Sequence, residues 1–464
     1  MRYQSTRGVD HSYTFTETVF EGLAPDGGLI VPETIPRLSG ETIEAWSKLD
    51  YLSLALEIFK LFATDIPTEA LRDIIKKSYS SFRHEEITPV VKVGDLYILE
   101  LFHGPTFAFK DIALQFLGNL FEYLLSKTGK KINILGATSG DTGASAIYAV
   151  RGKQGIAIFI LYPHQRVSPI QALMMTTVIE PNVHNIAIEG SFDDCQKIVK
   201  DLFMDLPLKR SYGLTAINSI NFARILAQIV YYFYAYFKVS KIESKREVRF
   251  AVPTGNFGDI FAGYLAKRML GRGIERLILA TNENDILARF VNYGDYSVGQ
   301  VIPTISPAMD IQVASNFERY LYYLFGEDTE KTALAMREFQ EKKRLSFTKE
   351  DLISVKKDFL ARSVTQEETL ETIRDFYHKN GYMLDPHTAV GVKAGLTFKE
   401  EGIPLICLST AHPAKFPETV SKAIGKDFPL PPEIEALKNK PQGFHILKAN
   451  IEEVKTYLQK NALT

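Results

Sequence analysis

Short apolar runs alternate with longer segments of helical character over most of the chain. This alternation is typical of a wound α/β architecture and not of a helical bundle or a β-sandwich. Six of the apolar runs are strand candidates. They are Lys131–Leu135, Ile156–Tyr162, Val183–Ile188, Val248–Val252, Leu277–Ala280 and Leu405–Leu408.

The beginning of the chain has a different pattern. Residues 1–90 carry amphipathic stretches such as Leu52–Phe62 and Thr68–Ser78, which predict an N-terminal helical extension. A short charged run, Ser240–Arg246, could separate two α/β lobes, so we expect lobes over residues 91–240 and 241–464. The strongly charged stretch 326–351 is interpreted as a solvated helix with a loop.

Length and composition narrow the class of protein. The chain has 464 residues, enough for two or three lobes, and is 45% hydrophobic and 23% charged. Its net charge of −1 gives no electrostatic footprint for nucleic acid or an anionic membrane, which favours work on small molecules. Cys195 and Cys407 are too few for a disulfide framework and have no metal-ligand spacing, so we expect a reducing compartment and no metal.

No segment predicts membrane insertion or export. The N-terminus lacks the apolar stretch of a secretory signal, and we expect a cytoplasmic protein. The most apolar window, Ile225–Phe237, is interrupted by Gln228 and is too short to cross a bilayer. We interpret it as a buried helix or a subunit contact.

Lys110 is the leading candidate for chemistry. It stands in the segment Glu100–Asp111 next to aromatic residues and a Gly-Pro turn. A lysine held against apolar surface has a lowered pKa, and its neutral amine can attack carbonyl carbon. Alternatively, the lysine stem simply lies along the rings and leaves the charge in water.

Two strand–loop–helix junctions are candidate anion sites. The first is the loop 136–143 after the strand candidate that ends at Leu135, and the second is the loop 253–259 after Val252. Such junctions direct backbone N–H groups and a helix dipole at an anion, although their small residues could also merely cap the helices. Neither loop fits the nucleotide-binding patterns. A lysine plus a phosphate site is what pyridoxal 5′-phosphate requires, and the other loop would then face the carboxylate of an amino-acid substrate.

A third candidate lies near the C-terminus. Ser409 and Thr410 follow the strand candidate Leu405–Leu408, so a hydroxyl there could meet the nitrogen of the cofactor ring. Unlike an aspartate, a hydroxyl would not hold that nitrogen as a cation. A strand end followed by a helix cap is the alternative reading.

Several long motifs in a fixed order carry a family resemblance. The chain resembles the bacterial and fungal branch of the threonine synthase family, within the tryptophan-synthase-β-like, fold type II enzymes that use pyridoxal phosphate. The resemblance covers nearly the whole length and implies two wound α/β lobes behind the N-terminal extension. Its motifs are Tyr3–Gly8, Ala24–Gly28, Glu100–Asp111, Ala137–Gly143, Asn218–Asn221, Gly255–Asp259, Ala280–Asp285, Ser306–Asp310 and Thr410–Phe416.

The resemblance also implies roles for individual residues. Lys110 would form the Schiff base with the cofactor, and Thr410 would lie at the pyridine nitrogen. One group of residues would hold the cofactor phosphate, with Asp259 completing the motif. Two further groups would bind the carboxylate and the phosphate of the substrate. The cofactor-phosphate group is Gly255, Asn256, Phe257 and Gly258; the carboxylate group is Thr138, Ser139, Gly140, Asp141 and Thr142; the substrate-phosphate group is Asn218, Ser219 and Arg224.

The implied reaction converts O-phospho-L-homoserine and water into L-threonine and phosphate, the last step of threonine biosynthesis. A phospho-lyase of the same kind, which would release 2-oxobutyrate, is the first alternative, and a non-catalytic scaffold with this fold is the second. A serine/threonine dehydratase has no need for a second phosphate site. Monomer and homodimer both remain open, and we expect no control by S-adenosylmethionine.

Overall fold

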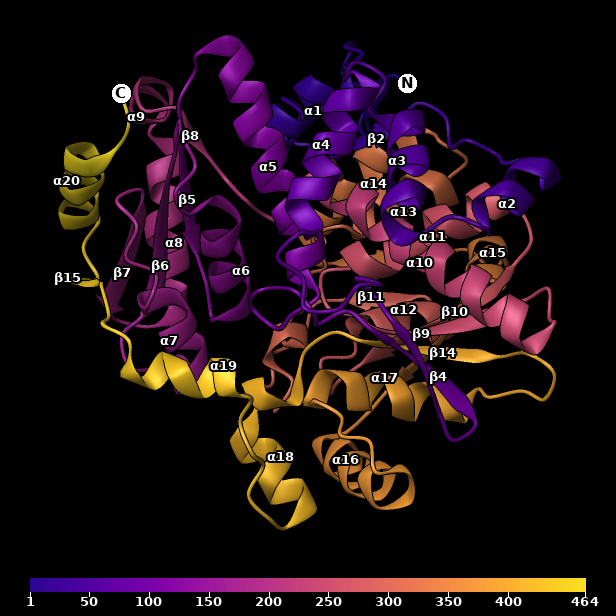
Figure 1. The fold of residues 1–464 in the computed structure, drawn as a ribbon. Coiled ribbons are helices and arrows are strands. Elements are labelled where there is room, and N and C mark those ends of the chain that lie inside the picture. Colours follow the sequence, from indigo (N-terminus) through magenta and orange to yellow (C-terminus); the bar gives the residue numbers. More distant parts are fainter. The chain divides into compact units, whose positions relative to one another are not determined.

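A computed structural model describes residues 1–464, and their internal contacts divide them into two compact units (Figure 1). Unit 1 comprises Met1–Arg72, His84–His103 and Ser219–Phe428, and unit 2 comprises Asp73–Arg83, Gly104–Asn218 and Pro429–Thr464. The chain therefore enters each unit more than once. This partition differs from consecutive lobes divided at residues 90 and 240, and that division stays a prediction.

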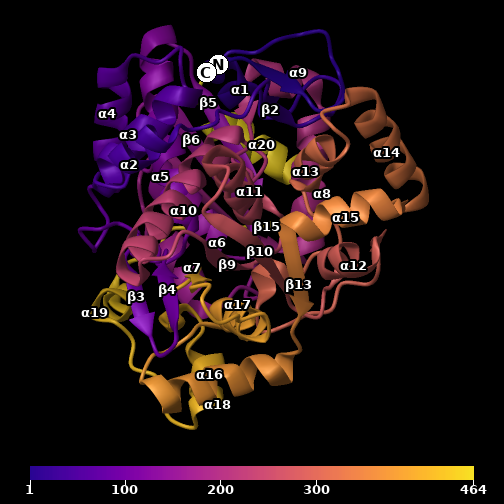
Figure 2. The ribbon, with the colours of Figure 1, turned by 90° about the vertical axis from the view of Figure 1, so that its right-hand side faces the viewer.

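Unit 1 is organised by a six-stranded sheet in the order β13-β10-β9-β14-β4-β3, of which β13, β10 and β9 can be followed in Figure 2. All neighbouring strands are parallel except β3 and β4. The carboxyl ends of β9, β14 and β4 consequently lie at one edge, where ligands bind in such sheets. The strands are β3 (Val90–Val93), β4 (Leu96–Glu100), β9 (Val248–Pro253), β10 (Ile274–Thr281), β13 (Phe359–Ser363) and β14 (Leu405–Ser409).

Helices pack on this sheet and build the rest of unit 1. Helix α17 lies against β9, β10 and β14, and α10 packs on α11. Two small antiparallel pairs, β1 (Tyr3–Ser5) with β2 (Ile30–Pro32) and β11 (Asp295–Ser297) with β12 (Arg344–Ser346), complete the unit. The helices are α1 (Phe15–Glu21), α2 (Gly40–Trp46), α3 (Tyr51–Phe62), α10 (Phe222–Glu243), α11 (Gly258–Leu270), α12 (Ile286–Tyr293), α13 (Phe317–Leu324), α14 (Thr329–Lys342), α15 (Lys349–Asp358), α16 (Gln366–Asn380), α17 (Pro386–Thr397) and α18 (Pro417–Ile424), while α4 (Thr68–Tyr79) runs from unit 1 into unit 2.

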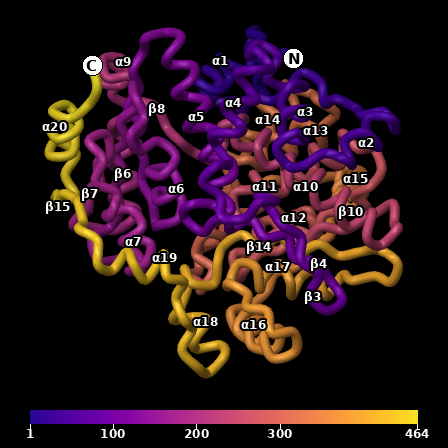
Figure 3. Tube along the Cα trace, viewed as in Figure 1, coloured from indigo at the N-terminus to yellow at the C-terminus, as the bar shows by residue number.

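Unit 2 is organised by a five-stranded parallel sheet in the order β15-β7-β6-β5-β8. Figure 3 traces how the C-terminal segment returns to it as β15, beside β7, and then as α20. Phe159 and Leu161 of β6 share one buried cluster with Leu202 of α8 and Leu458 of α20. The elements are β5 (Ile132–Ala137), β6 (Ile156–Pro163), β7 (Val183–Glu189), β8 (Leu214–Thr215), β15 (His445–Lys448), α5 (Lys110–Thr128), α6 (Asp141–Val150), α7 (Pro169–Thr176), α8 (Phe192–Met204), α9 (Leu206–Ser211), α19 (Pro432–Glu435) and α20 (Ile451–Asn461).

The wound α/β class is confirmed, and all six strand candidates are strands whose ends lie within three residues of the expected positions. The helical patterns near the N-terminus are helices α3 and α4. In the charged stretch 326–351, helix α14 was expected, but β12 and the start of α15 were not, because so short a strand carries no clear period.

The most apolar window of the sequence lies in the buried helix α10, as expected. This helix continues to Glu243, so the polar run Ser240–Arg246 is its last turn and the loop into β9, both inside unit 1. None of the helices combines the length and the apolar character that a bilayer crossing would need.

Candidate active site

Lys110 is the first residue of α5, and its side chain is 12% exposed. Its ammonium nitrogen lies 4.0 Å from a carboxylate oxygen of Asp141 and 4.9 Å from the centre of the Phe109 ring. Asp141 begins helix α6, which follows the first of the two predicted anion loops. In unit 2 the structure therefore brings the candidate lysine together with the loop 138–142.

The turn before Lys110 is held by a dense set of contacts. The backbone N–H and the hydroxyl of Thr106 each donate to the Asp111 carboxylate at 2.7 Å. The Arg83 guanidinium stacks on the Phe107 ring, 3.7 Å from its centre, and donates to the carbonyl oxygen of Gly104. Fixing the backbone on both sides of a lysine restricts where its amine can reach.

The loop 138–142 is closed largely by its own side chains. The hydroxyl of Thr138 accepts from the N–H groups of Gly140 at 3.0 Å and Gly143 at 2.9 Å. Gln171 of α7 donates from Nε2 to Oδ1 of Asp141 at 2.7 Å. Gly140 has φ +145°, and a Cβ there would come within 2.5 Å of the Gln171 amide. The hydroxyls of Ser139 and Thr142 make no internal hydrogen bond and remain available for a ligand.

The second anion loop follows β9 in unit 1. The backbone N–H groups of Gly255, Asn256, Phe257 and Gly258 have no acceptor within the protein, and the last of them begins the first turn of α11. A Cβ at Gly255 would lie 2.7 Å from the carbonyl oxygen of Ala308. Free donors at a helix start, in a loop too tight for side chains, suit a phosphate group.

Two anchors give this loop its shape. Phe257 adopts φ +65° and is buried among the rings of Phe317, Tyr320 and Phe359. The Asp259 carboxylate accepts hydrogen bonds from the hydroxyls of two tyrosines of α10, one of them at 2.8 Å. The aspartate thus ties the start of α11 to α10. The two tyrosines are Tyr231 and Tyr232.

Thr410 follows the last residue of β14, the neighbour of β9 in the sheet. It is buried, and its N–H donates to the hydroxyl of Thr388 at 3.3 Å. That hydroxyl also contacts Ser409 at 3.1 Å and donates to the carboxylate of Asp385. Thr410 therefore lies at the same sheet edge as the 255–258 loop, with its own hydroxyl not engaged.

The three predicted substrate-phosphate residues lie along one short segment. Asn218 is exposed and is the last residue of its stretch in unit 2, whereas Ser219 and Arg224 belong to unit 1. The hydroxyl of Ser219 contacts that of Ser315 at 2.8 Å. Arg224 lies in the first turn of α10.

Arg224 is a buried cation without a counter-charge. Its side chain is 5% exposed, no carboxylate pairs with it, and Nε has no hydrogen-bond partner. Burial lowers the pKa of its guanidinium to about 10. A buried unpaired charge costs several kcal/mol, so such a site favours an anionic ligand.

Three residues with a part in these arrangements carry no clear sequence signal. Gln171 is a single polar residue in an apolar helix, and Arg83 stands in a polar stretch well before the lysine motif. Asn316 contacts the backbone of Asn256, but it lies between the motifs that the sequence singles out. All three act through contacts that are distant in sequence, so only the folded chain reveals them.

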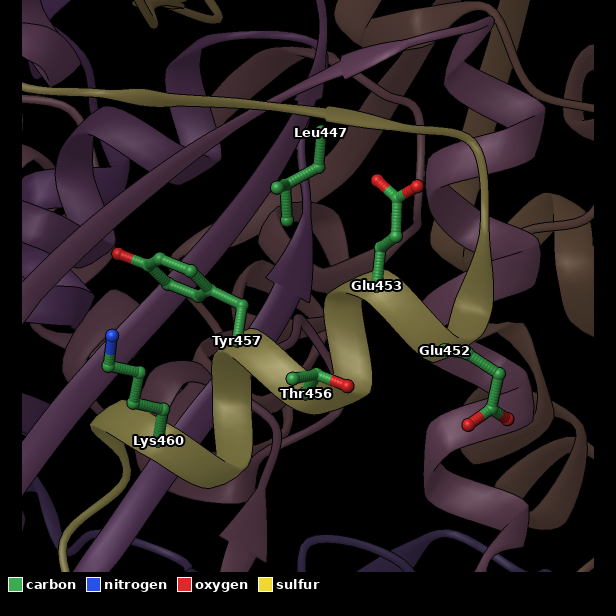
Figure 4. Close-up of a pocket in the computed structure, with 6 residues that line it drawn as sticks. All are labelled: Leu447, Glu452, Glu453, Thr456, Tyr457 and Lys460. Atoms are coloured by element: carbon green, nitrogen blue, oxygen red, sulfur yellow. The ribbon is translucent and has the colours of Figure 1, made fainter.

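A shallow hollow on unit 2 contains none of the predicted residues. Figure 4 shows that its lining comes from β15 and α20. The lining residues are Leu447, Glu452, Glu453, Thr456, Tyr457 and Lys460.

Comparison with known sequences agrees with this geometry. The family model described as "Pyridoxal-phosphate dependent enzyme" matches residues 82–348, which include Lys110 and both anion loops. Fold and site thus place the chain in the class of enzymes that depend on pyridoxal phosphate. Two further models, "Threonine synthase N terminus" and "Threonine synthase, C-terminal", match residues 2–79 and 388–458.

The chain belongs to the threonine synthase family. A threonine synthase of Schizosaccharomyces pombe is 48% identical over 458 residues, which cover 91% of this chain and 89% of that protein. The crystal structure of a PLP-bound threonine synthase from Brucella melitensis matches with a TM-score of 0.97 at 42% identity and covers all of both chains. The family resemblance and the fold predicted from the sequence are both confirmed, and the activity is that of a PLP-dependent threonine synthase.

A relative with another name is also similar. "Threonine synthase-like 2" of Xenopus laevis is 39% identical over 455 residues, covering 97% of this chain and 96% of that protein.

Proposed function

We propose that the chain converts O-phospho-L-homoserine and water into L-threonine and phosphate, with Lys110 as its catalytic residue. The buried, unpaired guanidinium of Arg224 is the observation that favours a phosphorylated substrate, because this cation has no anionic partner in the protein. The cofactor phosphate is assigned to a separate loop and so does not account for it. An amino-acid dehydratase would have no use for it.

Four parts of the chain are assigned to the binding of one cofactor. Lys110 binds its aldehyde, and the N–H groups of Gly255–Gly258 hold its phosphate, in line with the free donors of this loop. Asp259 supports the loop through α10, and Thr410 lies at the ring nitrogen. When bound, pyridoxal phosphate supplies a carbonyl for the lysine and a ring that withdraws electrons from the substrate Cα.

The substrate is assigned to two further sites. Its carboxylate is bound by the loop of Thr138, Ser139, Gly140, Asp141 and Thr142, whose free hydroxyls can donate to it. Its phosphate is bound by a second set, in which Arg224 supplies two parallel N–H donors and neutralises charge. This second set is Asn218, Ser219 and Arg224.

Proton transfer by Lys110 accounts for the sequence of steps. The amine removes the proton from Cα of the substrate, a proton then leaves Cβ, and phosphate departs from Cγ. Cγ is reprotonated, water adds at Cβ and Cα regains its proton, which gives threonine. The Asp141 carboxylate lies 4.0 Å from the amine of Lys110.

Turnover of O-phospho-L-homoserine, with threonine and 2-oxobutyrate measured separately, tests this function. We expect threonine and phosphate in equal amounts. Mainly 2-oxobutyrate without threonine would identify a phospho-lyase instead. Protein without a visible absorbance band and without any turnover would support the scaffold.

We also propose a cytoplasmic location and a small-molecule substrate as the only partner that activity requires. The two cysteines, Cys195 and Cys407, are free and buried, which suits a reducing compartment. Recovery of the enzyme from a membrane or secreted fraction would contradict this location. Sedimentation would decide between monomer and homodimer.

A further inference from the structure

Two fully buried polar residues stand at the start of α13, outside every motif assigned above. Asn316 precedes the first residue of the helix, and Arg319 lies in its first turn. Burying an amide and a guanidinium side by side is costly unless both are satisfied by hydrogen bonds. Each of them is satisfied by backbone carbonyl groups of other segments of unit 1.

Asn316 reaches both proposed phosphate-binding segments of unit 1. Its backbone N–H and its Nδ2 both donate to the carbonyl oxygen of Asn256, at 3.0 and 3.1 Å. The same Nδ2 lies 3.3 Å from the carbonyl oxygen of Ser219. One amide group therefore joins the loop 255–258 to the segment that leads into Arg224.

The neighbouring residues orient that amide. Arg319 donates to Oδ1 of Asn316 at 2.6 Å, so Nδ2 must face the two carbonyls. The rest of the Arg319 guanidinium donates to the carbonyl oxygens of Ile30 at 3.0 Å and Ile220 at 2.6 Å. Burial lowers the pKa of Arg319 to about 10, yet unlike Arg224 its donors have acceptors in the protein.

Asn316 also packs closely against the 255–258 loop. A Cβ at Gly258 would lie 3.3 Å from Nδ2 of Asn316, so the amide packs directly against this glycine. Pulling the Asn256 and Ser219 carbonyls towards one amide fixes both peptide planes. In the 255–258 loop this also sets the direction in which the N–H of Phe257 points, because it shares a peptide plane with the Asn256 carbonyl.

We infer that Asn316 is a positioning residue that couples the binding of the cofactor phosphate to the binding of the substrate phosphate. The inference rests on the proposed function of Gly255–Gly258 and of Arg224. Asn316 touches neither ligand. It holds the two segments in register, and Arg319 holds the amide in its orientation.

The isosteric variant Asn316→Asp tests this coupling in the full-length protein. A carboxylate keeps the contact with Arg319 but places an oxygen against the carbonyls of Asn256 and Ser219. We expect the dissociation constant for pyridoxal 5′-phosphate, titrated by absorbance, to rise about tenfold, and KM for O-phospho-L-homoserine to rise about tenfold. We expect kcat to fall less than about threefold. Affinity for pyridoxal, which lacks the phosphate, stays unchanged.

The matched control is Asn292→Asp, where the same change removes one donor to the carbonyl oxygen of Ala361, at 3.2 Å, on another strand of unit 1. It is expected to shift neither constant. Asn316→Ala replaces the aspartate variant if that protein does not fold, with the same expected shifts. A shift in only one constant, no shift at all, or an equal loss of pyridoxal affinity overturns the inference.

Ser315→Ala separates the two halves of the effect. The Ser315 hydroxyl contacts that of Ser219 at 2.8 Å and accepts from Nδ2 of Asn316 at 3.4 Å, but it makes no hydrogen bond to the 255–258 loop. KM should therefore rise about threefold while cofactor affinity stays the same. Arg224→Met distinguishes failure of the proposed function from failure of this inference. If Arg224→Met leaves KM unchanged, the substrate-phosphate assignment fails; if it raises KM and Asn316→Asp does not, only the coupling fails.

Discussion

The two strand–loop–helix junctions have the same local design but differ in the partners of their backbone N–H groups and of their aspartates. In the 138–142 loop of unit 2, one threonine hydroxyl takes two of the backbone N–H groups, and a carboxylate, Asp141, begins the helix beside Lys110. In the 255–258 loop of unit 1, the N–H groups have no protein acceptor, and the carboxylate of Asp259 is turned to the tyrosines of α10.

This difference supports the proposed assignment of one anion to each loop. Free backbone donors, with the nearby carboxylate directed at two tyrosine hydroxyls, suit a dianionic phosphate that stays bound. A loop that keeps its own carboxylate next to a lysine suits a singly charged group and permits proton transfer. Similar sequence patterns can therefore differ in their surroundings, because the aspartate that follows each loop has different partners: Lys110 and Gln171 for Asp141, and two tyrosines for Asp259.

The largest expected effect comes from the lysine beside the 138–142 loop. Lys110→Ala should lower kcat by about 10³-fold or more, because both the amine that binds the cofactor and the acid–base group are lost. Steady-state turnover and borohydride trapping followed by peptide mapping measure this. Lys127→Ala, an exposed lysine of the same helix, is the control and should retain full activity. Labelling at a site other than Lys110 would contradict the assignment.

The next prediction tests whether Arg224 binds a ligand or has a structural role. Arg224→Met should raise KM for O-phospho-L-homoserine by about 10²-fold, because charge-assisted hydrogen bonds to phosphate are lost. The same variant, free of substrate, should be more stable to unfolding by about 1–4 kcal/mol, since a buried unpaired charge is removed. Denaturant unfolding measures this second effect.

Arg319→Met should change the free energy of unfolding in the opposite direction to Arg224→Met. Its guanidinium is equally buried but donates to the carbonyl oxygens of Ile30 and Ile220, so its loss should lower the free energy of unfolding. Equal signs for the two variants would mean that Arg224 has a structural role.

A third prediction concerns the free donors of the 255–258 loop. Gly255→Ala should raise the dissociation constant for pyridoxal 5′-phosphate by about 30-fold, because the added Cβ would lie 2.7 Å from the Ala308 carbonyl and displace the loop. An absorbance titration measures this. Gly40→Ala, where a Cβ would meet nothing within 4 Å, should bind the cofactor normally. Normal affinity in Gly255→Ala would refute the phosphate assignment.

The smallest effect is expected in the loop that is already closed. Gln171→Ala removes the hydrogen bond to Asp141 but leaves Thr138 in place, so kcat/KM should fall only about three- to tenfold. Gln154→Ala, an exposed glutamine of the same unit, should have no effect. A loss as large as that of Lys110→Ala would mean that the two junctions do not differ in the way described.

Much of the architecture could be predicted from the sequence, because parallel strands buried on both faces are continuous apolar runs. All six strand candidates are parallel strands that are largely buried, although three of them include polar residues such as Asn133, Asn185 and Arg249. Most strands that were not predicted are short or lie at sheet edges, such as β3 and β15, where half-exposed residues give no clear period. The exception is β4, a buried apolar strand inside the six-stranded sheet that was also missed.

The candidate site could be predicted only for residues in local motifs. Lys110 and the glycines of the loop 255–258 carry their chemistry within a few neighbours. Gln171 and Asn316 act through partners that are distant in the chain, and an isolated amide has no period or spacing to reveal it. The sequence likewise cannot show that Arg224 lacks a counter-charge, because that depends on which side chains the fold brings near it.

The return of the chain to unit 2 has a consequence for biogenesis. Strand β15 adds to β7 at the sheet edge, and α20 joins a buried cluster with β6 and α8, yet the longest segment of unit 1, Ser219–Phe428, is synthesised between β7 and these elements. During translation β7 therefore remains an unpaired edge strand until β15 has been synthesised. Removal of the last residues should therefore leave a protein that aggregates rather than one that is merely shorter.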